Sequence, residues 1–187
     1  YKKIAGKTIN ASWTDFMGEE KSVRYRVPNV NQCKECHDAD DQISPIGPKA
    51  RNINKELDFK DGEFNQLVYW MNREIIDEYP MDLVSPVDWL DETKDINDRV
   101  RSYLDVNCGH CHSPTGNANS TGLYLHLNET RDINLGVFKK PVATGRGSGG
   151  NKYSIVPGKP EESILLYRMQ SMDPGVMMPE SGRALTH

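Results

Sequence analysis

The sequence has few apolar residues and no long apolar run. Only 36% of its 187 residues are hydrophobic, aromatic residues make up 8%, and the mean hydropathy is −0.69. No stretch approaches the roughly 18 consecutive apolar residues of a membrane span. A core made of side chains alone would therefore be thin, and a chain of this length forms one domain or two small ones.

The chain also lacks an excess of positive charge. It has 23 Lys and Arg residues against 27 Asp and Glu, a net charge of −4 and a pI near 5.7. Nucleic-acid-binding proteins need clustered basic residues, so the composition argues against a nucleic-acid partner. The sequence begins with Tyr1 and shows no signal-peptide pattern, which we interpret as a processed or truncated chain.

Cysteine is scarce, but all four cysteines fall in two C-x-x-C-H pentapeptides, at residues 33–37 and 108–112. This spacing is the attachment signature of c-type haem. Two thiols one helical turn apart can reach one porphyrin edge, and the following histidine binds the iron as the proximal ligand. The sequence therefore predicts two covalently bound haem c groups, with Cys33, Cys36, Cys108 and Cys111 as attachment residues and His37 and His112 as proximal ligands.

Three other interpretations of the cysteines compete with haem. A shared Cys₄ zinc site is disfavoured because residues 37–107 separate the two pairs, far more than the roughly 12–20 residues of zinc ribbons. The string Cys-Gly-His-Cys resembles the active-site motif of proteins with redox-active dithiols. Such a motif needs a strand–turn–helix setting, whereas residues 101–107 before it are polar and helical in pattern. Two structural disulfides would leave both histidines unexplained.

An electron-transfer haem needs a second axial ligand, usually Met or His. Met177 and Met178 lie in a Pro-bounded loop after an expected helix, which is how small cytochromes present the distal sulfur. We expect Met178 to be the ligand of the second haem, with Met177 as the alternative.

The distal ligand of the first haem is harder to assign. Met81 follows a helix and Tyr79-Pro80, which favours it, and Met71 is the next candidate although it lies in a helical stripe typical of core residues. His126, Met17 or an open site remain further possibilities.

Residues 143–150 are rich in glycine. A phosphate-binding loop is disfavoured because no Gly-Lys-Ser/Thr follows and no strand–helix frame surrounds it. We expect instead a loop that passes close over a haem face, with Arg146 near a propionate.

The pattern of the chain predicts a mainly α fold. Residues 7–13 and 22–27 alternate in polarity around Gly18 and predict a β-hairpin. Helices are expected at 64–76, from 96 into the second motif with Asp91 or Thr93 as its cap, and from Pro160 to 168. The helix–motif order repeats, so we expect a hairpin extension (1–28) and two small cytochrome c-like haem domains (29–88 and 89–187).

With these residues identified, the chain resembles a family of bacterial di-haem cytochrome c domains that are often attached to larger secreted proteins. The resemblance covers nearly the whole chain and rests on residues 27–33, 45–52, 65–67, 145–150 and 173–180. It implies two class I-like haem domains, electron transfer, and Met178 as a ligand.

Haem attachment and this resemblance together indicate a function. We expect an electron carrier, or a relay module of a larger oxidoreductase, in the periplasm or at the cell surface of a bacterium. Redox proteins would be its partners. The alternative is a di-haem peroxidase-like enzyme with one open haem site.

Overall fold

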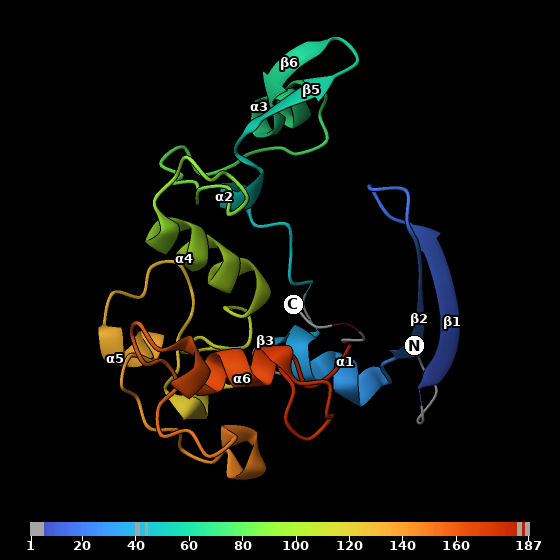
Figure 1. The fold of residues 1–187 in the computed structure, drawn as a ribbon. Helices are drawn as coiled ribbons and strands as arrows, with labels where there is room; N and C mark the ends of the chain where they lie inside the picture. Colours follow the sequence, from blue (N-terminus) through green and yellow to red (C-terminus); the bar gives the residue numbers. More distant parts are fainter. Residues whose placement is uncertain (1–5, 40–41, 44, 183–184, 186–187) are drawn as a thin grey trace.

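The computed structural model describes residues 6–39, 42–43, 45–182 and 185. Within them lie six short α-helices and three separate two-stranded antiparallel sheets (Figure 1). The helices are α1 (Val30–His37), α2 (Ala50–Ile53), α3 (Gln66–Asn72), α4 (Ile96–Asn107), α5 (Asp132–Leu135) and α6 (Ile164–Gln170). The strands are β1 (Lys7–Thr14), β2 (Glu20–Val27), β3 (Asp38–Ala39), β4 (Gln42–Ile43), β5 (Glu56–Phe59) and β6 (Gly62–Asn65). Single 3₁₀ turns occur at η1 (Asn119–Thr121), η2 (Gly145–Ser148) and η3 (Pro160–Glu162).

The expectation of a mainly α fold with two cytochrome c-like units is wrong. Helix accounts for 30% of the structure and strand for 17%, which makes it a small mixed α/β fold. The helices are short, and in the described residues between α5 and α6 the chain forms no helix beyond the single 3₁₀ turns η2 and η3. A sequence with low apolar content has few long stripes that could hold long helices against a core, and its Pro and Gly residues interrupt those that exist.

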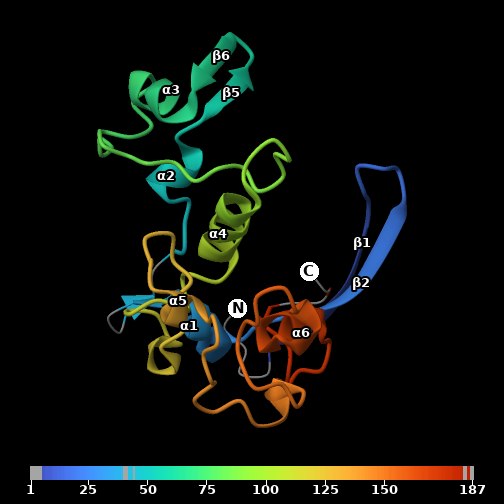
Figure 2. The same cartoon turned by 60° about the vertical axis from the view of Figure 1, so that its left-hand side comes forward.

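The N-terminal residues form the hairpin that their alternation predicts. β1 and β2 pair from Lys7↔Val27 to Thr14↔Glu20. Asp15 closes the turn, because its carboxylate accepts hydrogen bonds from the backbone N–H groups of Met17 and Glu19, both at 2.9 Å. In both views the hairpin projects away from the helices (Figures 1 and 2).

A second small unit comprises α2, β5, β6 and α3, and lies at one end of the molecule (Figures 1 and 2). Phe59 and Tyr69 stack with ring centroids 3.6 Å apart. α3 begins at Gln66 rather than at 64, because the residues before it pair with β5 and Asn65 caps the helix by accepting from the N–H of Leu67 at 3.0 Å. The expected helix over 64–76 is thus shorter at both ends.

α4 connects this unit to the rest of the chain. Its N-cap is Asp95, not Asp91 or Thr93, since the Asp95 carboxylate accepts from the N–H of Asn97 at 2.8 Å. Near its other end Asp105 is fully buried. Asp105 accepts two hydrogen bonds from Arg51 at 2.7 and 2.8 Å and one from the backbone N–H of Leu127 at 2.9 Å. One buried carboxylate therefore ties together α2, α4 and the segment before α5.

The apolar core is as thin as the composition predicts. Six hydrophobic side chains are buried among the described residues: Leu67, Leu104, Leu125, Ile164, Val176 and Met177. All but Leu67 belong to α4, α6 or the segments after them. Within the residues that the structure describes, no helix is long and apolar enough to cross a membrane.

Candidate functional site

The second C-x-x-C-H segment continues directly from α4. The N–H of Cys108 donates to the carbonyl of Leu104 at 2.9 Å, and the N–H of His112 donates to the carbonyl of Cys108 at 2.9 Å. Beyond the motif the chain turns back tightly. A Cβ at Gly116 would lie 2.2 Å from the carbonyl oxygen of Cys111, so only glycine fits there without a backbone shift. The two thiols and the histidine are thus held on a compact turn.

These residues line a cavity of about 390 Å³. Cys108, Cys111 and His112 contribute to its wall, and Met178 does as well. Apolar side chains from α6 and from the segment after the motif complete much of the lining, namely Leu123, Leu125, Ile164, Leu165 and Met169. The structure therefore brings together the second motif and its predicted distal ligand, which lie far apart in sequence.

The two neighbouring methionines of the loop after α6, Met177 and Met178, have different surroundings. The backbone of this loop is fixed because Val176 and Met177 donate to the carbonyl of Asp173, at 2.9 and 2.8 Å, and Met178 donates to that of Arg168 at 3.1 Å. Met177 is buried, with 7% of its surface exposed, and it is not among the described residues that line the cavity. Met178 is therefore the one of the pair that faces the second motif.

The surroundings of the His112 imidazole favour its neutral form. Burial lowers the pKa of His112 below its ordinary value. Its Nδ1 atom is buried and has no hydrogen-bond partner among the described residues. A neutral imidazole retains a lone pair, which is the form that binds a metal ion.

The first motif lies on α1. Asn29 and Gln32 cap this helix reciprocally, since each side-chain oxygen accepts the other's backbone N–H, at 2.9 and 3.1 Å. Cys33 and Cys36 are one turn apart and half-buried, and α1 has no fully buried residue.

Glu35 joins α1 to the second motif. Its carbonyl accepts hydrogen bonds from the Cys111 thiol at 3.6 Å and from the Asn117 amide at 3.0 Å. Its carboxylate accepts one from the Ser181 hydroxyl at 2.8 Å. Glu35 and Cys36 also contribute to the cavity wall. The two motifs therefore meet, although their sequence positions gave no indication of it.

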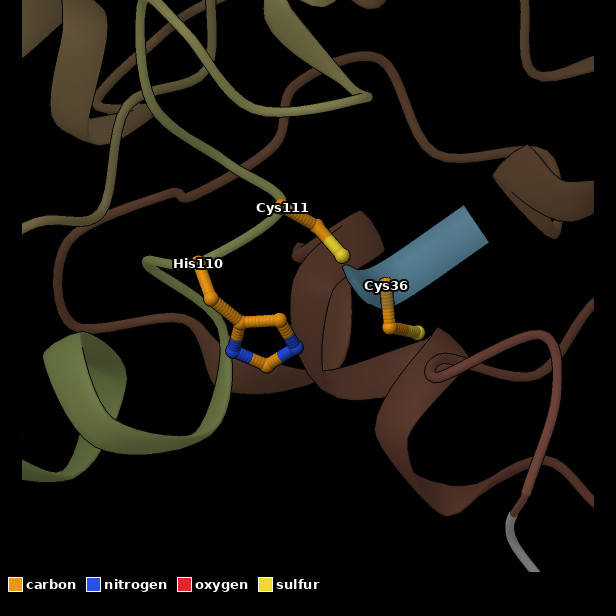
Figure 3. Close-up of side chains that lie close together, drawn as sticks. All are labelled: Cys36, His110 and Cys111. Carbon is orange, nitrogen blue, oxygen red and sulfur yellow. The ribbon is translucent and has the colours of Figure 1, made fainter. Parts of the chain in front are cut away.

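Cys36, His110 and Cys111 gather where the motifs meet (Figure 3). One ligand atom of each lies within 4.8 Å of the others. The pKa of Cys36 is lowered to about 4, chiefly through its hydrogen bonds with the Cys111 side chain and then with His110. The same hydrogen bond raises the pKa of Cys111, and burial raises the pKa of Cys108 to about 11.

The glycine-rich loop packs against α6 and the methionine loop. Gly149, with φ of +60°, lies so close to the Tyr167 ring that a Cβ would come within 2.7 Å of it. Arg146 pairs with Asp173 at 2.8 Å, and its side chain is 68% exposed. It is not among the described residues that line the cavity, whereas Arg168 and Lys139 are. Arg146 thus contacts the loop that carries Met178, and its predicted contact with a propionate stays a prediction.

The candidates for the first distal position are scattered. Met81 is 86% exposed and Met71 36%, and both belong to the part of the chain around and after α3, which lies away from α1 in both views (Figures 1 and 2). Met17 is 71% exposed in the hairpin turn, and the carbonyl of His126 accepts from Arg101 at 2.9 Å. None of these four lines the cavity in the described parts of the chain. Met81 as the first distal ligand stays a prediction.

Sequence reasoning missed Arg168, Lys139 and Glu35. Arg168 donates from Nε to the carbonyl of Val176 at 2.7 Å, and its side chain is only 17% exposed. The only available signal was its place at the end of the predicted last helix, just before the methionine loop. Glu35 lies inside the first motif, but nothing in the sequence indicates contacts to residues 111, 117 and 181.

Comparison of the chain with protein-family models, with curated proteins and with solved structures found no significant match.

Proposed function

We propose that this protein is a di-haem c-type cytochrome that transfers electrons. The observation that carries the proposal is that the second motif and Met178 lie around one cavity. Its wall includes Cys108, Cys111, His112 and Met178. All four cysteines of the chain belong to C-x-x-C-H motifs, which supports the same function for the first motif.

The second site passes a simple test of fit to a haem. Its volume of about 390 Å³ lies within the roughly 300–1,000 Å³ of cofactor pockets. Its donors are two thiols, a thioether and an imidazole whose buried Nδ1 has no hydrogen-bond partner among the described residues, and Leu, Ile and Met side chains surround them. This is the donor set of a His/Met haem c.

Each side chain of the second site would then have one task. Cys108 and Cys111 would hold the porphyrin through thioether bonds, and His112 and Met178 would bind its iron. The bound group supplies reversible one-electron exchange between ferric and ferrous iron. Leu125 and Ile164, both buried, exclude water from the site, and the cations Arg168 and Lys139 can pair with propionate carboxylates at its wall.

Electron transfer is favoured over catalysis because a carrier needs only axial ligation, burial and a docking surface. Cys33, Cys36 and His37 would hold the first haem on α1. Attachment of haem to cysteines is carried out outside the bacterial cytoplasm, so the proposal includes a periplasmic or cell-surface location and redox proteins as partners.

Intact mass is the direct test of the cofactors. The full chain should be produced in a bacterial host with a haem-attachment system, and its mass should exceed that of the polypeptide by two haems. Acid–acetone should extract neither. Extractable haem, or a chain of unchanged mass, would refute the proposal.

Addition of carbon monoxide or cyanide tests the peroxidase-like alternative. A carrier with both sixth positions closed should bind neither ligand rapidly, and the Met81→Ala variant reports whether Met81 closes the first site. Rapid binding by the wild type, together with peroxide turnover after half-reduction, would favour the enzyme instead.

A further inference from the structure

Two thiols from different motifs approach each other more closely than the haem motifs require. The ligand atoms of Cys36, His110 and Cys111 lie within 4.8 Å of one another, and all three residues line the cavity. In Figure 3 the Cys36 side chain comes from α1, while His110 and Cys111 come from the turn after α4, and the three gather around one space. A haem motif uses Cys36 together with Cys33, so its spacing does not explain this grouping.

The distances suit a small tetrahedral ion. Zinc lies about 2.3 Å from a thiolate and about 2.0–2.1 Å from an imidazole nitrogen, which places tetrahedral ligand atoms roughly 3.5–4 Å apart. The ligand atoms lie within 4.8 Å of one another, so they need to contract by no more than about 1 Å to reach that spacing. The turn that carries two of the ligands is compact, and α1 is fixed beside it by the hydrogen bond from the Asn117 amide to the Glu35 carbonyl, which metal binding would leave in place.

The charges also suit a divalent ion. Two thiolates and one neutral imidazole balance the charge of Zn²⁺, so that a half-buried site would be neutral overall. Each thiol that binds gives up its proton to solvent, and no oxidation is involved. Since all three ligands face the cavity, the fourth position would be taken by water.

We propose that Cys36, His110 and Cys111 form a binding site for one thiophilic divalent metal ion, such as Zn²⁺, in the thiol form of the chain. The site shares Cys36 and Cys111 with the proposed haem attachment, but it is inferred from the cluster of ligand atoms and not from the proposed function. Because one sulfur cannot be both a metal thiolate and a haem thioether, the metal and the haems would exclude each other. The ion would hold the two motifs together before haem attachment.

Cobalt titration tests the site directly. The full chain is produced without a haem-attachment system, reduced under anaerobic conditions and titrated with Co²⁺, which reports thiolate ligation by charge-transfer absorption. We expect saturation at one ion per chain and displacement by Zn²⁺. Cys36→Ser and Cys111→Ser should abolish the charge-transfer band. His110→Ala should weaken binding by at least about 10–100-fold, the loss seen even for outer partners of metal ligands.

Cys33→Ser and Cys108→Ser are the matched controls, since each removes a thiol of the same motifs that lies outside the cluster. Both should keep the band, and circular dichroism should show that His110→Ala remains folded. Absence of binding, equal loss in the controls, or a Cys36–Cys111 disulfide that persists under reduction would each overturn the proposal. A failure to attach haem would leave these results readable, because the two experiments use separately produced chains.

Discussion

The two C-x-x-C-H segments have the same pattern but different surroundings. The first lies on α1, a helix with no buried residue, and Glu35 and Cys36 contact the second motif from it. The second follows α4, beside the buried Leu104 and Asp105, and lines a cavity that α6 and the methionine loop help to form. A short motif therefore determines which reactive groups are present, whereas the pocket around them depends on segments distant in sequence.

The largest expected effect comes from removing the cysteines of one motif at a time. Replacement of Cys108 and Cys111 by Ala should remove one of two haems from the mass, and so should replacement of Cys33 and Cys36. The second-motif variant should lose several kcal/mol more unfolding free energy, since its haem would fill a cavity in the core. Denaturant unfolding and intact mass measure both effects, and equal destabilisation would remove the contrast between the motifs.

Variants of Met177 and Met178 distinguish core packing from iron ligation at the second site. Met177→Ala should cost about 2–4 kcal/mol of unfolding free energy, because a buried side chain is removed, and should leave the haem spectrum unchanged. Met178→Ala should cost less stability but should convert the second haem to high spin and lower its potential. Absorption and EPR spectra of both variants provide the measurement. A spectral change in Met177→Ala alone would exchange the two assignments.

The buried carboxylate of Asp105 supports α4 just before the second motif. Burial opposes its charge, but hydrogen bonds from Arg51 and the Leu127 N–H outweigh this and lower the pKa of Asp105. Asp105→Asn should therefore destabilise the chain by about 3 kcal/mol near pH 7, measured by denaturant unfolding. The exposed Asp61–Arg73 pair is the matched control, and Asp61→Asn should shift the unfolding midpoint very little.

The pH dependence of this effect has a definite sign. A carboxyl with a lowered pKa stabilises the folded state above the pKa of the unfolded chain, about 3.9, and loses this contribution as the pH falls through the folded value. The difference between wild type and Asp105→Asn should accordingly shrink below about pH 4. A constant difference down to pH 2 would mean that the ion pair does not cause it.

How much of the structure could be predicted from the sequence depended on how far apart in the sequence the interacting residues lie. The N-terminal hairpin followed from local alternation, and α4 from its apolar face, since both signals lie within a few residues. Met178 lines the cavity and Met177 does not, but the choice of Met178 as a haem ligand stays a prediction. The mainly α fold was wrong because the helices are short and make up only 30% of the structure, while residues such as 56–65 pair as strands.

The meeting of the two motifs could not have been predicted. It depends on the backbone carbonyl of Glu35, whose hydrogen bonds to Cys111 and Asn117 span 76 and 82 residues. A carbonyl is present at every position, so no residue type marks the contact. The Asp105–Arg51 pair had the same difficulty, since one Asp among many gives no sign that its side chain will be buried.

The smallest expected effect concerns Arg146, which contacts the second site from outside. Its pair with Asp173 is exposed, so Arg146→Gln should cost less than about 1 kcal/mol of unfolding free energy. The same pair holds the loop that begins at Asp173, so the variant should reduce slightly the fraction of second haem ligated by Met178, seen as a minor high-spin signal in EPR. Lys159→Gln, which breaks another exposed pair, should change neither. If Arg146→Gln instead shifted the potential of the second haem as strongly as Met178→Ala, Arg146 would act on the haem directly, as the sequence suggested for a propionate partner.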